Sequence, residues 1–327
     1  MKYNNGDYYD GNWKNNIKEG KGKMKYKNGD EYDGTWFNDQ FINGKIKNEK
    51  GDIYYGDWID NKKSGKAFMF YSNGDTIEGK WINDKLEGYG LMKYNYGDIF
   101  QGYWKNNLKD GEGNLKSQNG DEYIGLWKDD ILIEGKVKYK NGDYYKGNLN
   151  QKNKDKYGKM KYNNGNEYEG DWKNDKKNGE GIMNYLNGDK YDGNWKDDKK
   201  DGFGSLEYIN GNVYNGYWLN DKKNGDGVLE LNNGEKYGGY WVNDKKEGKG
   251  IIKYTNGDEY DGNWKDDLKD GYGIMKYNDG KVYEGYWNND VIIKGIMKYT
   301  NGDEYQGDWK NDKKEGNGKM KFKNGDV

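Results

Sequence analysis

The stretch Tyr32-Asp33-Gly34-Thr35-Trp36 is one copy of a pattern, Y-x-G-x-W, that returns along the whole chain. Most copies continue with G-x-G, an apolar residue, a tyrosine and then N-G-D, so that one copy takes 22 or 23 residues. A fixed period of this length is typical of repeat arrays, so we expect one continuous array over residues 1–327, with half-repeats at both ends. Leu149 fills one slot, and the other thirteen hold Trp13, Trp36, Trp58, Trp81, Trp104, Trp127, Trp172, Trp195, Trp218, Trp241, Trp264, Trp287 and Trp309.

The spacing of two within the pattern predicts β-strands. Tyr32, Gly34 and Trp36 then share one face of a strand, and Asp33 and Thr35 lie on the other. The second half of the copy alternates in the same way, with glycine, Met and Tyr on one face and Lys on the other. The expected fold is therefore all-β: an elongated, twisted, single-layer antiparallel sheet, a solenoid-like ribbon of about 14 stacked hairpins.

The two connections of each hairpin are expected to differ. A two-residue turn at Asn28-Gly29 would put Tyr26 opposite Glu31 and mix the two faces, so the loop must have an odd length. A type I turn followed by Gly29 in the left-handed region meets this condition. The opposite connection, Lys-Asn-Asp-Lys-Lys-x-Gly in many copies and Lys173 to Gly179 in one, reads as a longer polar loop.

Glycine recurs in mid-strand, where it normally weakens a sheet. We expect the Tyr and Trp rings to lie across this glycine backbone and cover a sheet that has no second layer. On the opposite face, Lys23 and Lys25 are expected to meet Asp33 and Glu31.

The composition gives little support for catalysis. The chain has no His and no Cys, its few serines have no nearby partners, and its carboxylates recur at equivalent, solvated positions of the repeat. N-G-D-x-x-x-G lacks the alternating ligands and final Glu of a calcium loop. Acidic and basic residues nearly cancel, at a net charge of −2, which disfavours nucleic acid. We therefore expect no enzyme, no catalytic residue, no cofactor, no metal and no nucleic-acid partner.

Y-x-G-x-W, then G-x-G, then N-G-x-x-Y at this period resembles the MORN repeat (membrane occupation and recognition nexus) over essentially the whole chain. The resemblance implies a trough-like ribbon of hairpins that serves as a scaffold for other proteins. Chains made only of such repeats are similar to protist cytoskeletal scaffolds and to ciliary ones. The implied location is the cytoplasm, at the cytoskeleton, with the cilium as one candidate. The alternative is a peripheral adaptor that binds membrane phospholipids.

Three copies have 22 residues and carry apolar residues where Lys-Lys normally stands. We consider two interpretations for them: a shortened loop folds its apolar residues over the local core, or these residues are contact points for partner proteins. The residues are Phe41, Ile42, Ile131, Leu132, Ile133, Val291, Ile292 and Ile293.

The two ends of the array suggest self-association. Met1-Lys2-Tyr3 corresponds to the end of a second strand, and the chain closes near Phe322 at the same point of the repeat. Bare strand edges favour pairing with another chain. We expect an end-to-end homodimer or a larger assembly; the alternative is a monomer with frayed ends.

Overall fold

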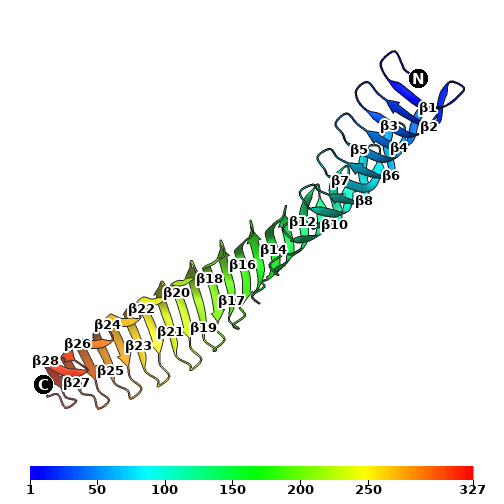
Figure 1. Ribbon diagram of the computed structural model, residues 1–327. Helices are drawn as coiled ribbons and strands as arrows, with labels where there is room; N and C mark the ends of the chain where they lie inside the picture. Colours follow the sequence, from blue (N-terminus) through cyan, green and yellow to red (C-terminus); the bar gives the residue numbers. More distant parts are fainter. Residues whose placement is uncertain (327) are drawn as a thin grey trace. The chain divides into compact units, whose positions relative to one another are not determined.

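The computed structural model describes residues 1–326, and within them all regular structure is β-strand. The chain divides into two compact units, Met1–Asn163 and Asn164–Val327. Within each unit, strands that follow one another along the chain pair antiparallel, so hairpin follows hairpin (Figure 1). The expectation of an all-β array of antiparallel hairpins is confirmed.

The first unit contains fourteen strands: β1 (Tyr8–Lys14), β2 (Ile17–Lys25), β3 (Glu31–Phe37), β4 (Gln40–Lys47), β5 (Ile53–Ile59), β6 (Lys62–Phe70), β7 (Thr76–Ile82), β8 (Lys85–Lys93), β9 (Ile99–Lys105), β10 (Leu108–Lys116), β11 (Glu122–Lys128), β12 (Ile131–Lys138), β13 (Tyr144–Asn150) and β14 (Asn153–Lys161). The second unit also contains fourteen: β15 (Glu167–Lys173), β16 (Lys176–Asn184), β17 (Lys190–Lys196), β18 (Lys199–Glu207), β19 (Val213–Leu219), β20 (Lys222–Glu230), β21 (Lys236–Val242), β22 (Lys245–Lys253), β23 (Glu259–Lys265), β24 (Leu268–Lys276), β25 (Val282–Asn288), β26 (Val291–Lys298), β27 (Glu304–Lys310) and β28 (Lys313–Lys321).

The N-G-D connection is the three-residue loop that strand parity predicts. The Tyr26 N–H donates to the Asp30 carbonyl at 2.9 Å, and the Gly29 N–H donates to the Tyr26 carbonyl at 3.0 Å. Gly29 lies in the left-handed region at φ +100°, as a type I turn with a following bulge requires. Met24 therefore pairs with Tyr32 on one face, and Lys25 with Glu31 on the other.

The opposite connection is short, so the prediction of a long polar loop there is wrong. Asn174 and Asp175 form a two-residue turn between β15 and β16, with φ of 49° and 67°. Both values are left-handed, as a type I′ turn requires, and Asn and Asp tolerate this region better than other residues with side chains. The Lys-Lys-x-Gly segment that follows belongs to the next strand.

A bulge inside each hairpin absorbs the residues that sequence reasoning assigned to a long loop. Gly216 pairs with Gly227 and Trp218 pairs with Lys223, so three residues of β20 lie opposite one residue of β19. In the 22-residue copies the bulge has one extra residue instead of two. Trp287 pairs there with Ile292 and Tyr286 with Lys294, which leaves Ile293 as the bulged residue. These copies are shortened in the bulge, and their turns keep two residues, for example Asn289 and Asp290.

The core lies on one face of each unit, which we call the core face. Glycines from neighbouring strands stand opposite one another there, as Gly204, Gly216 and Gly227 do. The Tyr214 ring lies over this row, because a Cβ placed on Gly227 would be 2.6 Å from its Cζ. The Tyr214 hydroxyl donates to the Tyr217 carbonyl at 3.1 Å. The predicted covering of glycine backbone by aromatic rings is thus confirmed.

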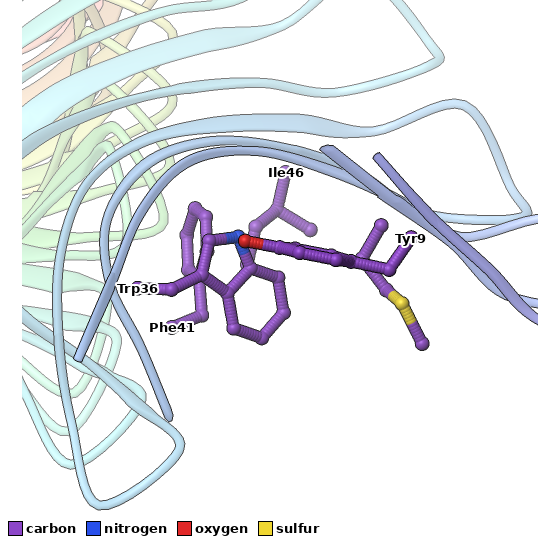
Figure 2. Close-up of a cluster of buried hydrophobic side chains, with 5 residues drawn as sticks. Tyr9, Trp36, Phe41 and Ile46 are labelled. Carbon is purple, nitrogen blue, oxygen red and sulfur yellow. The ribbon is translucent and has the colours of Figure 1, made fainter. Parts of the chain in front are cut away.

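The tryptophans join each repeat to the next. The Trp218 ring meets the ring of Tyr191, in the preceding repeat, edge to face at a centroid distance of 5.6 Å. Its indole N–H donates to the Gly204 carbonyl at 3.2 Å. Figure 2 shows the same arrangement in the first unit, where Tyr9, Trp36, Phe41 and Ile46 pack under the curved strands. Edge-to-face pairs add to the burial of apolar area and fix the spacing between repeats.

Both long edges of each unit are joined by carboxylate and amide side chains. At the N-G-D edge, Asp30 Oδ1 accepts the backbone N–H of Glu49 in the next loop, at 2.8 Å. At the other edge, Asp221 Oδ1 accepts the backbone N–H of Lys200 at 2.9 Å, and the Asp221 N–H donates to the Lys200 carbonyl at 3.0 Å. The recurrence of Asp and Asn at these positions therefore has a structural cause.

The opposite face, which we call the outer face, carries ion pairs in the first hairpins. Lys23 Nζ lies 2.8 Å from Asp33 Oδ2, and Lys25 Nζ lies 2.9 Å from Glu31 Oε1, as predicted. All four side chains are at least half exposed, so solvent screens each pair and its main effect is on strand register.

We predict that Gly216→Val destabilises the protein much more than Lys222→Ala. A Cβ at Gly216 would lie 2.5 Å from Gly227 Cα and 2.6 Å from Tyr214 Oη, whereas Lys222 is an exposed first residue of β20. We expect losses in the free energy of unfolding of about 2–4 kcal/mol and less than about 0.5 kcal/mol, respectively. Denaturant unfolding measures both, and equal losses would contradict the packing of rings on glycine.

We also predict that the protein loses stability above about pH 10. Burial raises the pKa of Tyr94 and Tyr185 from 10.0 to about 12, with nearby Asp carboxylates adding to the effect. The folded chain therefore keeps these protons while the unfolded chain releases them, and this stability is lost as the pH rises from about 10 through 12. Burial lowers the pKa of Lys177 and Lys200, which acts in the opposite sense below 10.5.

Denaturant midpoints and tyrosinate absorbance, recorded from pH 8 to about 12, check this prediction. Unfolding and late tyrosine ionisation should coincide. Titration of nearly all tyrosines near 10.0, with no loss of structure, would contradict it.

Candidate binding surfaces

A row of lysines crosses the core face of the second unit. Each is the second residue of a strand, next to the tight turn, and so lies on the same face as the tryptophans. Lys177 Nζ is 4.2 Å from the Trp195 ring centroid and 5.6 Å from that of Tyr168. The same geometry recurs at Lys200, Lys223, Lys246 and Lys269. The lysine stems thus cover the aromatic core while the ammonium groups contact ring faces.

Burial and neighbouring carboxylates act on this row in opposite directions. It lowers the pKa of Lys223, and the Asp244 and Asp267 carboxylates oppose the shift. The carboxylates come from the tight turns of the following two repeats, so each lysine is held between rings and acids of its neighbours. Within this row, the Lys269 ammonium group also lies 3.7 Å from Asp290 Oδ1.

Sequence reasoning missed this row because it placed Lys-Lys in a loop. A two-residue turn at Asn-Asp puts the second lysine of the pair on the face of the tryptophans. Counting alternate strand positions from such a turn would have predicted the row.

The second residue of these strands, opposite the tryptophan, is a position that we call the slot. In the first unit, it holds an apolar residue in two 22-residue copies and Leu86 in another copy. Along that unit the slot holds Lys18, Phe41, Lys63, Leu86, Lys109, Leu132 and Lys154, so cation and apolar residue alternate. Phe41 and Leu132, together with Ile292 in the second unit, are buried and pair with tryptophans. A partner protein has no access to these three side chains in the folded array.

The remaining predicted contact residues divide by their position in the strand. Ile42 and the exposed Ile133 and Ile293 are bulged residues, and Ile42 is half-buried. Ile131 and Val291 begin their strands and are 38% exposed. The period of two therefore splits each apolar run between the core and the solvent. Ile292 itself is 3% exposed and so lies in the core.

The tryptophans and the first quoted motif lie as follows. Trp36 and most of the other tryptophans are buried, Trp58, Tyr32 and Gly34 are intermediate, and Trp13 is 40% exposed.

The two residues expected at the end contacts differ in exposure. Tyr3 packs against the first core cluster, whereas Phe322 is 43% exposed.

Two adjoining hollows lie on the core face of the first unit. Tyr94, Lys109 and Asp130 line both of them. Lys109 Nζ lies 3.5 Å from Asp130 Oδ1 and 5.6 Å from the Tyr94 ring, so these groups already contact one another. Across residues 1–326 there is no group of three or more carboxylates that could hold a metal ion, and no helix that could span a membrane.

A comparison with protein-family models matches the MORN repeat at residues 9–31, 54–76, 78–98, 100–122, 168–190, 191–213, 214–236, 237–259, 260–282 and 305–327. The stretches left between these matches contain the three 22-residue copies and the copy with Leu149. No curated protein matches the chain.

Several solved structures are similar to parts of the chain. The TCP domain of SAS-4 (dCPAP) of Drosophila melanogaster, in complex with a proline-rich motif of Ana2 (dSTIL), is 21% identical, with a TM-score of 0.31, covering 48% of this chain and 87% of that one. The TCP10 domain of Danio rerio CPAP is 12% identical, with a TM-score of 0.27, covering 74% and 99%. A streptogramin B lyase has a TM-score of 0.14 at 14% identity, covering 81% and 90%.

The matched family segments make up more than half of the chain, and they coincide with hairpins whose Tyr, Gly and Trp residues build the core. On these grounds the chain belongs to the MORN repeat family.

Proposed function

We propose that this chain is a non-enzymatic scaffold that binds other proteins in a cytoskeletal or ciliary assembly. The observation that carries the proposal is the use of the recurrent polar groups. Asp30, Asp221 and their equivalents hold backbone N–H groups of a neighbouring repeat, and the lysines next to the tight turns lie over tryptophan rings. These groups join repeats to one another, so a partner meets the exposed sheet faces and turns.

The family supports this reading, because arrays built only of such repeats resemble cytoskeletal and ciliary scaffolds. The geometry supports it as well. Successive hairpins present equivalent surfaces about 9.6 Å apart, twice the distance between neighbouring strands, and this spacing suits an extended partner. The corresponding location is the cytoplasm, on the cytoskeleton.

We propose Ile131 and Ile133 in the first unit, and Val291 and Ile293 in the second, as contacts for partner proteins. They are 38–42% exposed, whereas Leu132 and Ile292 between them are buried. A partner that covers these apolar side chains would remove their exposed surface from water, which favours binding.

We predict that a tagged copy, expressed in the cell from which the chain comes, stays with the detergent-insoluble cytoskeleton. Val291→Lys with Ile293→Lys should reduce the retained fraction by about half or more without changing the unfolding midpoint. Ile292→Asp is the matched control, because its short side chain leaves a carboxylate in the core, where the long stems of the lysines at equivalent positions place their ammonium groups over the rings, and it should lower the midpoint instead. Extraction of the wild-type chain by detergent, with salt-sensitive binding to phosphatidylserine vesicles, would favour the lipid adaptor and contradict the scaffold.

A further inference from the structure

The outer face of the first unit carries aromatic side chains where the first hairpins have ion pairs. Tyr55 on β5 pairs with Phe68 on β6, and its ring also meets that of Phe70 at a centroid distance of 6.1 Å. On β8 and β9, Tyr89 pairs with Tyr103 at 5.5 Å. These five residues, which we call the outer aromatic patch, are 42–55% exposed.

The patch contributes little to the core. Tyr54, Met69, Met92 and Phe100 occupy the alternate positions of the same strands and are buried on the core face. The sheet has a single layer, so nothing in the first unit covers the outer rings. Large exposed aromatic groups mark interaction surfaces more often than they stabilise a monomer.

Unpaired lysines surround the patch. Lys45 lies over the Tyr55 ring at 5.8 Å and opposite Asp33, and Lys66 on β6 stands directly opposite Lys80 on β7, which has Glu87 opposite it on its other side. Within residues 1–326, the four lysines Lys45, Lys66, Lys80 and Lys93 form no salt bridge. Lys23 and Lys25, on the outer face of the first hairpins, do form salt bridges. Like charges placed directly across a strand pair are destabilising, so an acidic partner would relieve this repulsion.

We propose that the outer aromatic patch and these four lysines bind an acidic protein segment that carries aromatic or aliphatic anchor residues. The proposal deepens the scaffold function above by naming the surface and the chemistry of one partner. The segment spans β5 to β9, about 19 Å, with anchors on the two ring clusters and carboxylates near Lys66 and Lys80.

An anionic membrane fits this surface less well. Glu78 on β7 stands directly opposite Phe68, between the two ring clusters. A peptide places an uncharged residue against that carboxylate, whereas a bilayer presents negative headgroups across the whole patch. The charge pattern therefore favours a protein segment.

Fluorescence polarisation with the full chain tests the proposal against three labelled peptides of equal length. One combines Asp and Glu with Phe and Leu anchors, the second replaces the acids by Lys, and the third replaces the anchors by Ser. The first peptide should bind at least about tenfold more tightly than either of the others, and should weaken as salt rises from about 50 to 300 mM. Absence of binding, or equal binding of all three, overturns the proposal.

Two double variants locate the site. Tyr89→Thr with Tyr103→Thr, and separately Lys66→Glu with Lys80→Glu, should each weaken the first peptide by about tenfold or more. The matched control is Phe203→Thr with Tyr217→Thr, because these rings pair at 5.6 Å in the second unit, where Glu180, Asn194 and Glu207 take the places of Lys66, Lys80 and Lys93. The control should change the affinity by less than about twofold, and an equal loss there overturns the assignment.

Circular dichroism of each variant shows whether the fold is kept. Phosphatidylserine vesicles that compete with the peptide, and that bind only when Tyr89 and Tyr103 are intact, would replace the protein segment by a membrane and overturn the proposal. If the wild-type chain stays with the cytoskeleton but does not bind the first peptide, this surface alone is refuted. Recovery of the wild-type chain with membranes refutes the scaffold function instead.

Discussion

The tyrosine ring lying on a row of glycines is the contact on which the rest of this structure depends. A single-layer sheet has no opposing sheet, so its core must come from side chains that lie flat on their own backbone. Glycines such as Gly216 and Gly227 leave room for the Tyr214 ring, which the tryptophans of its own and the next repeat contact edge to face. The chain also contains a natural variation: where Ile77 takes the place of the tyrosine, a Cβ on Gly90 would meet its nearest atoms only at 3.1 Å.

This packing determines what the surfaces offer to other molecules. The aromatic rings, the lysines next to the tight turns and the carboxylates at the edges connect neighbouring repeats. Repeats can therefore differ in what they bind only on the outer face and at the bulged residues. The first hairpins use the outer face for ion pairs, whereas β5 to β9 place aromatic rings and unpaired lysines there. One repeat therefore provides a constant core and a surface that changes from hairpin to hairpin, as a protein-binding scaffold requires.

Most of the fold could be predicted from alternation alone. Tyr26 and Tyr32 must lie on the same face of the sheet, which predicts an odd loop length at Asn28-Gly29. The recurrence of glycine in mid-strand predicts that aromatic rings lie on the backbone. The tight turn could not be found in this way, because Asn174-Asp175 resembles a polar loop until its left-handed dihedral angles are known. That error hid the bulge, and with it the slot shared by Lys177, Leu132 and Ile292. The outer aromatic patch was visible as aromatic residues at charged positions, but its unpaired lysines depend on contacts across strands that only the structure shows.

A double-mutant cycle on Tyr214 and Gly227 tests the central contact most directly. A Cβ on Gly227 would overlap the Tyr214 ring, so Gly227→Ala should cost about 2–4 kcal/mol of unfolding free energy in the wild-type chain and less than about 1 kcal/mol in the Tyr214→Val background. This result would show that the glycine is required because the ring lies on it. If the two costs add independently, the glycine serves the backbone alone and the account is wrong.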